Sequence, residues 1–231
     1  MAHNRSQALQ GPRARWLDRW LPALGVVSSL AVFGCASIDG GAEADRMAAA
    51  VVQSSFRDQG IAKVDRLQQD ESNRECSAAD VAGKPIAAQS AARIEAASLK
   101  TVRWPADGKF LGDWREGEKI AQNGRGMTWT DKAGAPNGGN CYNCHQITKQ
   151  EISFGTLGPS LYQYGKLRGV TDPASAQAKP IVDYTWAKIW NARASNACSS
   201  MPRFGHSGIL NEGQVRHVMA LLLDPQSPVN R

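Results

Sequence analysis

The sequence predicts a mainly α-helical protein with long loops, and three observations carry this prediction. No stretch alternates between apolar and polar residues as a half-buried strand does. Glycine and proline gather in residues 131–140 and 155–180, as is typical of loops. Near the C-terminus, apolar residues recur at helical spacing on one face: Val215, Val218, Met219 and Leu222.

Two alanine-rich stretches predict a helical N-terminal extension within residues 36–100. The first covers residues 45–70, which are rich in Ala, Gln, Arg and Asp, and the second covers residues 80–99. Residues 36–44 contain Gly40-Gly41, so we expect a flexible tether there. In the second stretch the expected buried positions are Ile86, Ile94 and Leu99.

Residues 101–231 read as one domain of short helices and loops. Residues 104–108 predict a turn, because Pro105 restricts the backbone and Gly108 frees it. A short helix is expected over 111–122, ended by Gly124. A further helix over 184–194 would direct three residues to the core: Trp186, Ile189 and Trp190.

The last predicted helix has a start and a stop signal. Asn211 is a good N-cap, and Gln214, three residues later, completes a capping box. The dipeptide Asp224-Pro225 ends the helix, because proline cannot continue it.

Length and charge narrow the classes of function. A chain of 231 residues suits one domain with extensions, or two small domains. Residues 1–34 hold four Arg and one Asp, and so contribute half of the formal net charge of +6. The remaining charge is mild and no basic stripe is interleaved with aromatic residues, so we expect no nucleic-acid partner.

The N-terminus has the features of an export signal over residues 1–35. Basic residues precede an apolar stretch over 21–34, which is too short to span a bilayer comfortably. The sequence Val32-Phe33-Gly34-Cys35 resembles a bacterial lipobox, which predicts lipidation of Cys35. Cleavage after Ala36 and an uncleaved anchor are the alternatives. All three place the domain outside the cytoplasm, and we expect the periplasm, with lipid anchoring to the membrane through Cys35.

The segment Cys141-Tyr142-Asn143-Cys144-His145 carries the clearest chemistry, because C-x-x-C-H is the attachment pattern of haem c. Two thiols at this spacing reach the two vinyl groups, and the next residue offers an imidazole to the iron. A thioredoxin-like pair would need a βαβ context, and a zinc site would need a second ligand pair. The sequence therefore predicts one covalent haem on Cys141 and Cys144, with His145 as proximal ligand.

A second segment, Gly158-Pro159-Ser160-Leu161, supports this interpretation. In small c-type cytochromes, the carbonyl group of such a proline accepts the imidazole N–H of the proximal histidine. That hydrogen bond fixes the ring and raises its basicity as a ligand. We therefore expect Pro159 beside the cofactor.

The distal ligand is expected from the loop Ser200-Met201-Pro202-Arg203-Phe204-Gly205, with Met201 as the candidate. A thioether ligand closes the iron to small molecules and makes an electron carrier. His206 is the main rival, since ligation by two histidines lowers the potential. Arg203 could meet a haem propionate or be a solvated surface residue. Other candidates for the ligand are Met127, Met219 and His217, and candidates for the pocket wall or for plain core are Tyr164, Trp190 and Phe204.

Cys76 and Cys198 are the remaining cysteines. In an oxidising compartment they suggest a disulfide that ties the N-terminal extension to the loop of Met201. A buried free thiol and a reactive thiol are the alternatives.

Several runs together resemble the SoxX family of sulfur-oxidation cytochromes over residues 76–231. Its expected fold is a class I-like monohaem cytochrome c domain. The runs most specific to the family are Asn137-Gly-Gly-Asn-Cys-Tyr-Asn-Cys-His145, Met201-Pro-Arg-Phe-Gly205 and the ending Ser227-Pro-Val-Asn230.

The resemblance implies the electron-accepting subunit of a SoxAX cytochrome. That complex, an L-cysteine S-thiosulfotransferase, oxidatively joins thiosulfate to a cysteine of the carrier protein SoxYZ. The active haem would belong to the SoxA-type partner, and a soluble cytochrome c would accept the electrons. The alternatives are a free-standing respiratory electron carrier, a haem enzyme or gas sensor with an open sixth position, and a subunit whose haem is structural.

Overall fold

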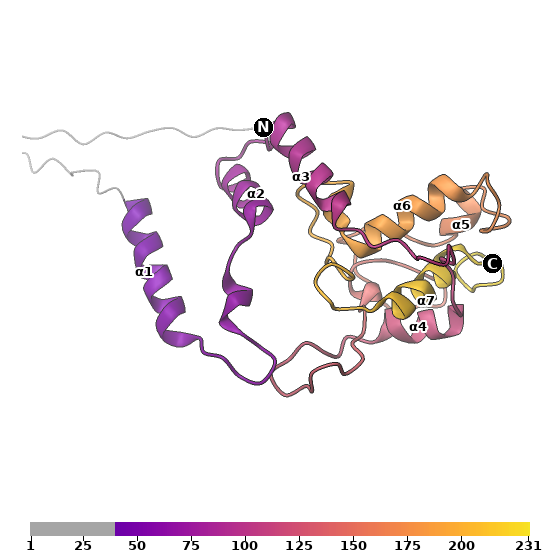
Figure 1. The fold of residues 1–231 in the computed structure, drawn as a ribbon, viewed down its shortest axis with the longest axis horizontal. Helices are drawn as coiled ribbons and strands as arrows, with labels where there is room; N and C mark the ends of the chain where they lie inside the picture. The colour runs from indigo at the N-terminus through magenta and orange to yellow at the C-terminus, as the bar shows by residue number, and fades with distance from the viewer. Residues whose placement is uncertain (1–39) are drawn as a thin grey trace, which may run out of the picture. The chain divides into compact units, whose positions relative to one another are not determined.

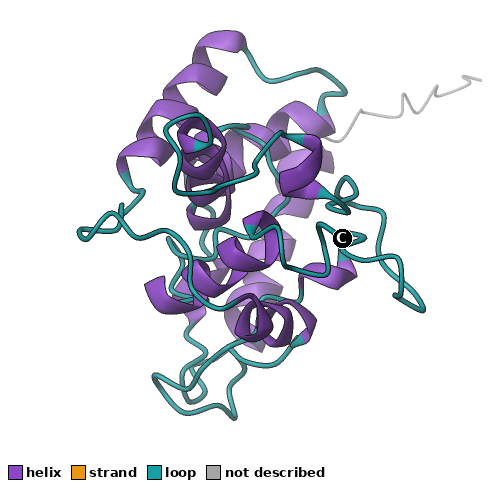
Figure 2. Ribbon diagram, turned by 90° about the vertical axis from the view of Figure 1, so that its right-hand side faces the viewer, coloured by secondary structure: helices purple, strands orange, loops and turns teal. Residues whose placement is uncertain are grey.

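A computed structural model of the chain describes residues 40–231. The expected signal segment, Cys35 and residues 36–39 of the expected tether lie outside the described residues. Residues 49–231 form one compact unit, and residues 40–48 belong to another. The described part is mainly helical, as expected: Figure 2 draws helices and loops but no strand there, and the only pairing is an isolated bridge between Gln59 and Ala62. None of the helices in this part is long and apolar enough to cross a bilayer.

The helix α1, Gly40–Ser55, corrects two expectations. The tether prediction is wrong from Gly40 onward, because the alanines that follow favour helix strongly enough to include both glycines. The predicted helix over 45–70 is wrong beyond Ser55, where the chain becomes irregular around Gly60, whose φ is +49°. A short 3-10 helix, η1, Val64–Leu67, follows.

The second alanine-rich stretch, residues 80–99, holds the last two residues of one helix and most of another, where the sequence predicts a single helix. The two helices are α2, Glu71–Val81, and α3, Ala88–Lys100. Gly83, with φ of +60°, and Pro85 separate them, because neither residue continues a helix well. Ile94 is buried as expected, Ile86 is half-buried, and Leu99 is wrong as a buried position, since it is exposed beside the helix end.

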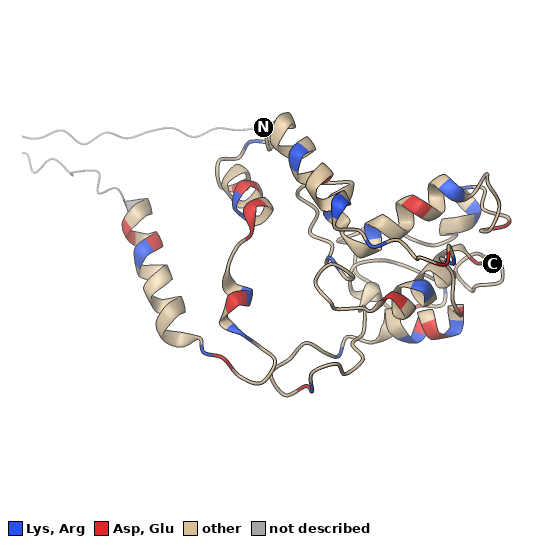
Figure 3. Ribbon diagram, viewed as in Figure 1, with Lys and Arg blue, Asp and Glu red and all other residues tan. Residues whose placement is uncertain are grey.

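The core of the domain is built around α7, Glu212–Leu223. Figure 1 shows α4, Trp114–Gln122, running beside α7, while α6, Lys179–Trp190, and the short α5, Tyr164–Leu167, contact α7 elsewhere. The backbones of α4 and α7 approach closely at Gly117, where an added Cβ would overlap the carbonyl group of His217. Acidic and basic residues are interspersed on α4 and α6 (Figure 3).

The two ends of α7 lie where the sequence predicts them. The Asn211 side chain accepts the N–H of Gln214 at 2.9 Å, and the Gln214 side chain accepts the N–H of Asn211 at 3.1 Å, which forms the capping box. Asp224 is the C-cap. The expected apolar face is buried, and its members are Val215, Val218, Met219 and Leu222.

α6 supplies the aromatic part of the core, although it begins five residues before the predicted start at residue 184. Pro180 lies in its first turn, where proline is favourable because no intrahelical N–H is needed. Trp186 is fully buried, stacks on Trp190 at 5.8 Å and meets Phe110 edge-on at 5.4 Å between ring centroids. Ile189 is buried too, so all three expected core residues of this helix are confirmed.

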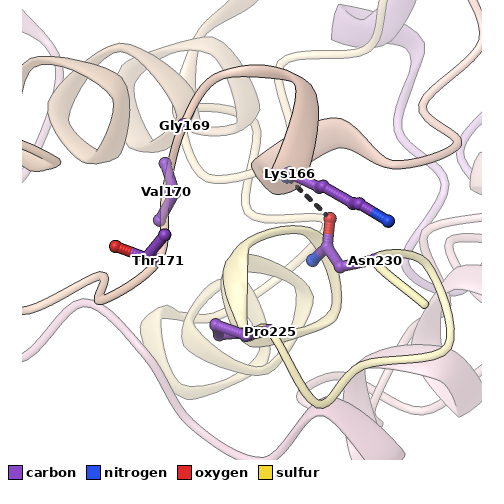
Figure 4. Close-up of a pocket in the computed structure, with 6 residues that line it drawn as sticks. All are labelled: Lys166, Gly169, Val170, Thr171, Pro225 and Asn230. Atoms are coloured by element: carbon purple, nitrogen blue, oxygen red, sulfur yellow. Dashed lines mark hydrogen bonds between the residues drawn. The ribbon is translucent and has the colours of Figure 1, made fainter.

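The C-terminal segment locks α5 against α7 through Asn230. Its Oδ1 accepts the N–H groups of Gly165 and Lys166, and its Nδ2 donates to the carbonyl group of Leu222 at 3.1 Å. A surface pocket of about 230 Å³ lies beside this contact (Figure 4). Both polar ends of Asn230 are used within the protein, and the polar residues Lys166 and Thr171 also line the pocket.

Candidate haem site

The segment 141–145 folds as one tight turn that carries both thiols and the imidazole. The N–H groups of Cys144 and His145 both donate to the carbonyl group of Cys141, at 3.1 and 2.9 Å. The turn begins after Asn140, whose φ of +50° is left-handed, and the N–H of Gly139 is bound to the carbonyl group of Ile120 at 2.8 Å. The end of α4 therefore anchors the start of the motif.

Cys141 is half-buried and packs against the apolar core, and this burial raises the pKa of its thiol to about 12. Reactive redox cysteines have lowered pKa values and are partly exposed. Among the described residues, Cys141 and Cys144 are the cysteines without a disulfide. This environment disfavours a thioredoxin-like pair and suits a thiol that is joined to an apolar group.

A loop that includes Pro159 runs alongside the motif and is tied to it by three backbone hydrogen bonds. The N–H of Gly155 donates to Tyr142 at 3.0 Å, that of Gly158 to Cys144 at 2.8 Å, and that of Leu161 to Gln146 at 2.7 Å. These contacts bring the carbonyl oxygen of the proline to 2.7 Å from Nδ1 of the His145 ring.

This contact fixes the tautomer of His145. A carbonyl oxygen only accepts, so Nδ1 must carry the proton and donate it to Pro159. In the neutral ring Nε2 then keeps a free lone pair, and it makes no hydrogen bond to any described residue. A neutral imidazole that is held through one nitrogen and open at the other is the form that ligates a metal.

Gly158 makes the close approach possible, because a Cβ at this position would overlap the His145 ring. The glycine, the proline carbonyl and the imidazole therefore form one packed unit. The sequence indicates this unit through the segment Gly158-Pro159-Ser160-Leu161, and the structure brings Pro159 of that segment to His145.

Met201 lies half-buried against the same core cluster that Cys141 borders. The loop that carries Met201 is fixed at its C-terminal end, where the N–H groups of Gly205 and His206 donate to the carbonyl group of Trp190 at 3.1 and 2.9 Å. An added Cβ at Gly205 would overlap the Trp190 ring, so the loop lies directly on α6.

Asn137 connects the loop before the motif to the residues after the methionine loop. Its side chain donates to the carbonyl group of Ile209 at 2.9 Å, and its own carbonyl group accepts from the Gln214 side chain at 2.7 Å. The two segments that carry the proposed iron ligands are thus fixed to the same end of α7.

The other candidate ligands have different environments. Nδ1 of His217 accepts the N–H of Asp113 at 2.9 Å, and Met219 is fully buried in α7, as core packing predicts. Met127 has a left-handed φ of +62° in a loop. His206 stays the rival, since burial first and the Arg203 charge second hold its pKa below the usual value and favour a neutral ring.

Arg203 pairs with Asp70 at 2.7 Å. The sequence had suggested either a haem propionate or solvent for this side chain, and it gave no signal for Asp70, which lies at the start of α2. The three aromatic candidates for a pocket wall are all buried in the core cluster: Tyr164, Trp190 and Phe204.

Cys76 and Cys198 form a disulfide across a sequence separation of 122 residues. The structure therefore has the pairing that the sequence suggests, and it joins α2 to the start of the methionine loop. No group of three or more His, Cys, Asp or Glu side chains able to hold a metal ion occurs among residues 40–231. The described donors fit a group that is bound through two thiols and one imidazole better than a bare ion.

Comparison with known proteins gives one further finding. No protein-family model matches the chain. A stretch of 132 residues is 36% identical to an uncharacterized lipoprotein from Aquifex aeolicus (strain VF5), covering 57% of this chain and 59% of that protein. The chain is therefore similar to a protein named a lipoprotein over about three fifths of that protein's length.

Proposed function

We propose that the chain is an exported monohaem c-type cytochrome whose cytochrome domain, residues 101–231, is class I-like. Haem would be joined to Cys141 and Cys144, with His145 as proximal and Met201 as distal ligand. The observation that supports this most strongly is the 2.7 Å contact between Nδ1 of His145 and the carbonyl oxygen of Pro159. It prepares an imidazole for a metal in a turn that also carries two thiols.

The residues of the site have separate roles in this proposal. The haem, when bound, supplies an iron that gains and loses one electron. Pro159 orients the imidazole and raises its basicity, and Gly158 leaves room for the ring. The thioether sulfur of Met201 would close the second axial position, which favours electron transfer over ligand binding.

The resemblance to SoxX extends the proposal to partners. We propose that the chain pairs with a SoxA-type cytochrome in a complex that couples thiosulfate to a cysteine of SoxYZ. Electrons would pass through this chain to a soluble cytochrome c. The thiosulfotransferase activity would belong to the complex.

We also propose that Cys35 is lipidated and holds the domain at the periplasmic side of a membrane. The lipobox-like sequence before Cys35 supports this, and so does the name of the similar Aquifex aeolicus protein.

Purification from the native host grown on thiosulfate tests the partner proposal. We expect a second cytochrome of the SoxA kind to copurify in near-equal amount. A monohaem protein that stays alone under gentle conditions would favour the free-standing electron carrier and withdraw the sulfur chemistry.

The distal ligand has its own test in three variants. We expect Met201→Ala to lose the weak absorption of a thioether–iron bond and to bind carbon monoxide when reduced. Met127→Ala is the matched control, since it truncates another half-buried methionine in a loop. If the wild type lacks this absorption, and reduced His206→Ala binds carbon monoxide while reduced Met201→Ala does not, the distal ligand is His206.

A further inference from the structure

Asp70 lies at the centre of a charge network between the N-terminal extension and the methionine loop. Its carboxylate pairs with Arg203 at 2.7 Å and with Arg193 at 3.1 Å. The same side chain caps α2 by accepting the N–H of Asn73 at 2.8 Å. One residue of the extension therefore holds two arginines that flank Met201 in the sequence.

The two arginines are well shielded. The side chain of Arg193 is 12% exposed and that of Arg203 is 23% exposed. Arg193 also donates to the side chains of Ser72 and Asn73. The side chain of Asp70 is more open, at 39% exposed, so solvent screens these ion pairs in part. Loss of its carboxylate still leaves two shielded arginine charges uncompensated.

Two further contacts tie the same loop to the extension. The Cys76–Cys198 disulfide fixes the residue three positions before Met201, and the N–H of Ala197 donates to Glu95 of α3 at 3.2 Å. On the other side of Met201, Arg203 is held by Asp70. The methionine thus lies between a covalent and an ionic attachment to the same extension.

We propose that Asp70 is a positioning residue for the distal ligand: it holds Arg203, and so keeps the loop closed with Met201 on the iron. This inference rests on the proposed function, because it takes Met201 to be the ligand. The extension then acts as a strap that sets how often the thioether leaves the iron, while the core determines the fold of the domain.

The test compares Asp70→Asn with wild type in the full haem-loaded protein. Asparagine is as good an N-cap as aspartate, so α2 keeps its cap while the charge is lost. Asp107→Asn is the matched control, because Asp107 pairs with Arg216 at 2.8 Å away from the methionine loop. The readouts are the thioether–iron absorption of the oxidised protein and the rate at which added imidazole replaces the thioether.

We expect imidazole to bind Asp70→Asn about three- to tenfold faster than wild type, with a weaker thioether–iron absorption. Asp107→Asn should match wild type. Equal rates in Asp70→Asn and Asp107→Asn would overturn the role of Asp70 while leaving the ligand intact. A wild type without the thioether–iron absorption would overturn the Met201 assignment itself, and the role of Asp70 with it.

A second variant keeps the proposal testable if Asp70→Asn folds poorly. Cys76→Ala/Cys198→Ala removes the covalent attachment and leaves Asp70 in place. Faster imidazole binding in this variant supports the strap, and a rate equal to wild type contradicts it.

Discussion

The helices α7 and α2 are attached to the protein in opposite ways. α7 buries seven of its 12 residues, all of them apolar, whereas α2 buries only Ser72 among 11. α2 is held by the Asp70 ion pairs and by the Cys76–Cys198 disulfide. The core is therefore stabilised mainly by the burial of apolar side chains. The extension is held instead by ion pairs, which low pH removes, and by a disulfide, which reductants cleave.

The largest expected effect comes from breaking the core at Trp186. This residue is fully buried between Trp190 and Phe110, and its indole N–H donates to the carbonyl group of Arg103 at 2.8 Å. We expect Trp186→Ala to lower the free energy of unfolding by about 3–5 kcal/mol in denaturant titration.

Val81→Ala is the control for Trp186→Ala, because Val81 is 90% exposed at the end of α2. We expect it to change the free energy of unfolding by less than about 0.5 kcal/mol. A similar loss in both variants would contradict the contrast between core and extension.

The disulfide gives the next largest effect. Its long loop restricts the unfolded chain, so Cys76→Ala/Cys198→Ala should lower the free energy of unfolding by about 2–5 kcal/mol. Limited proteolysis should then cut within α2 and α3 before it cuts the core. Cleavage that begins in the core instead would show that the extension is held mainly by its other contacts.

Asp70 gives a smaller, pH-dependent effect. Burial opposes its charge, but the N–H of Asn73, the hydroxyl group of Ser72 and the Arg203 guanidinium together hold its pKa well below the usual value. Its stabilisation is therefore complete above the unfolded pKa of about 4 and is lost as the pH falls further toward the folded pKa.

The stability of Asp70→Asn should follow that pH dependence. We expect a lower unfolding free energy than wild type near neutral pH, and a difference that shrinks below about pH 4. A difference that is constant with pH would mean that the charge of Asp70 contributes nothing.

The smallest effect is expected at Arg93, which bridges Glu71 and Glu75 between α3 and α2 at the exposed surface. We expect no measurable change in the midpoint of thermal unfolding for Arg93→Ala, because exposed ion pairs contribute little and salt screens them. A clear, salt-dependent fall would show that this surface pair also holds the extension.

The sequence predicts the core better than the extension, for a physical reason. The capping box of α7 and its apolar face are local signals, and both are confirmed. The start of α6 was missed because Pro180 resembles a loop residue, although proline suits a first turn. The break between α2 and α3 had a local signal in Gly83 and Pro85, which the alanine-rich composition outweighed.

Within the candidate site, too, contacts made by a short sequence segment are predictable and contacts between distant elements are not. The approach of Pro159 to His145 follows from a short, recognisable segment. The pairing of Asp70 with Arg193 joins residues 123 apart, and no local pattern in one sequence marks such a contact. Signals that act within a few residues can be predicted, whereas ion pairs between distant elements depend on how those elements pack.

Mass spectrometry of the exported protein tests the central proposal most directly. Trypsin cleaves after Lys132 and Lys149 and releases residues 133–149, which contain Cys141, Cys144 and His145 and have no internal cleavage site. The proposal predicts that this peptide carries the mass of one haem and that neither thiol can be alkylated. An unmodified peptide with two alkylated thiols would contradict the cytochrome assignment.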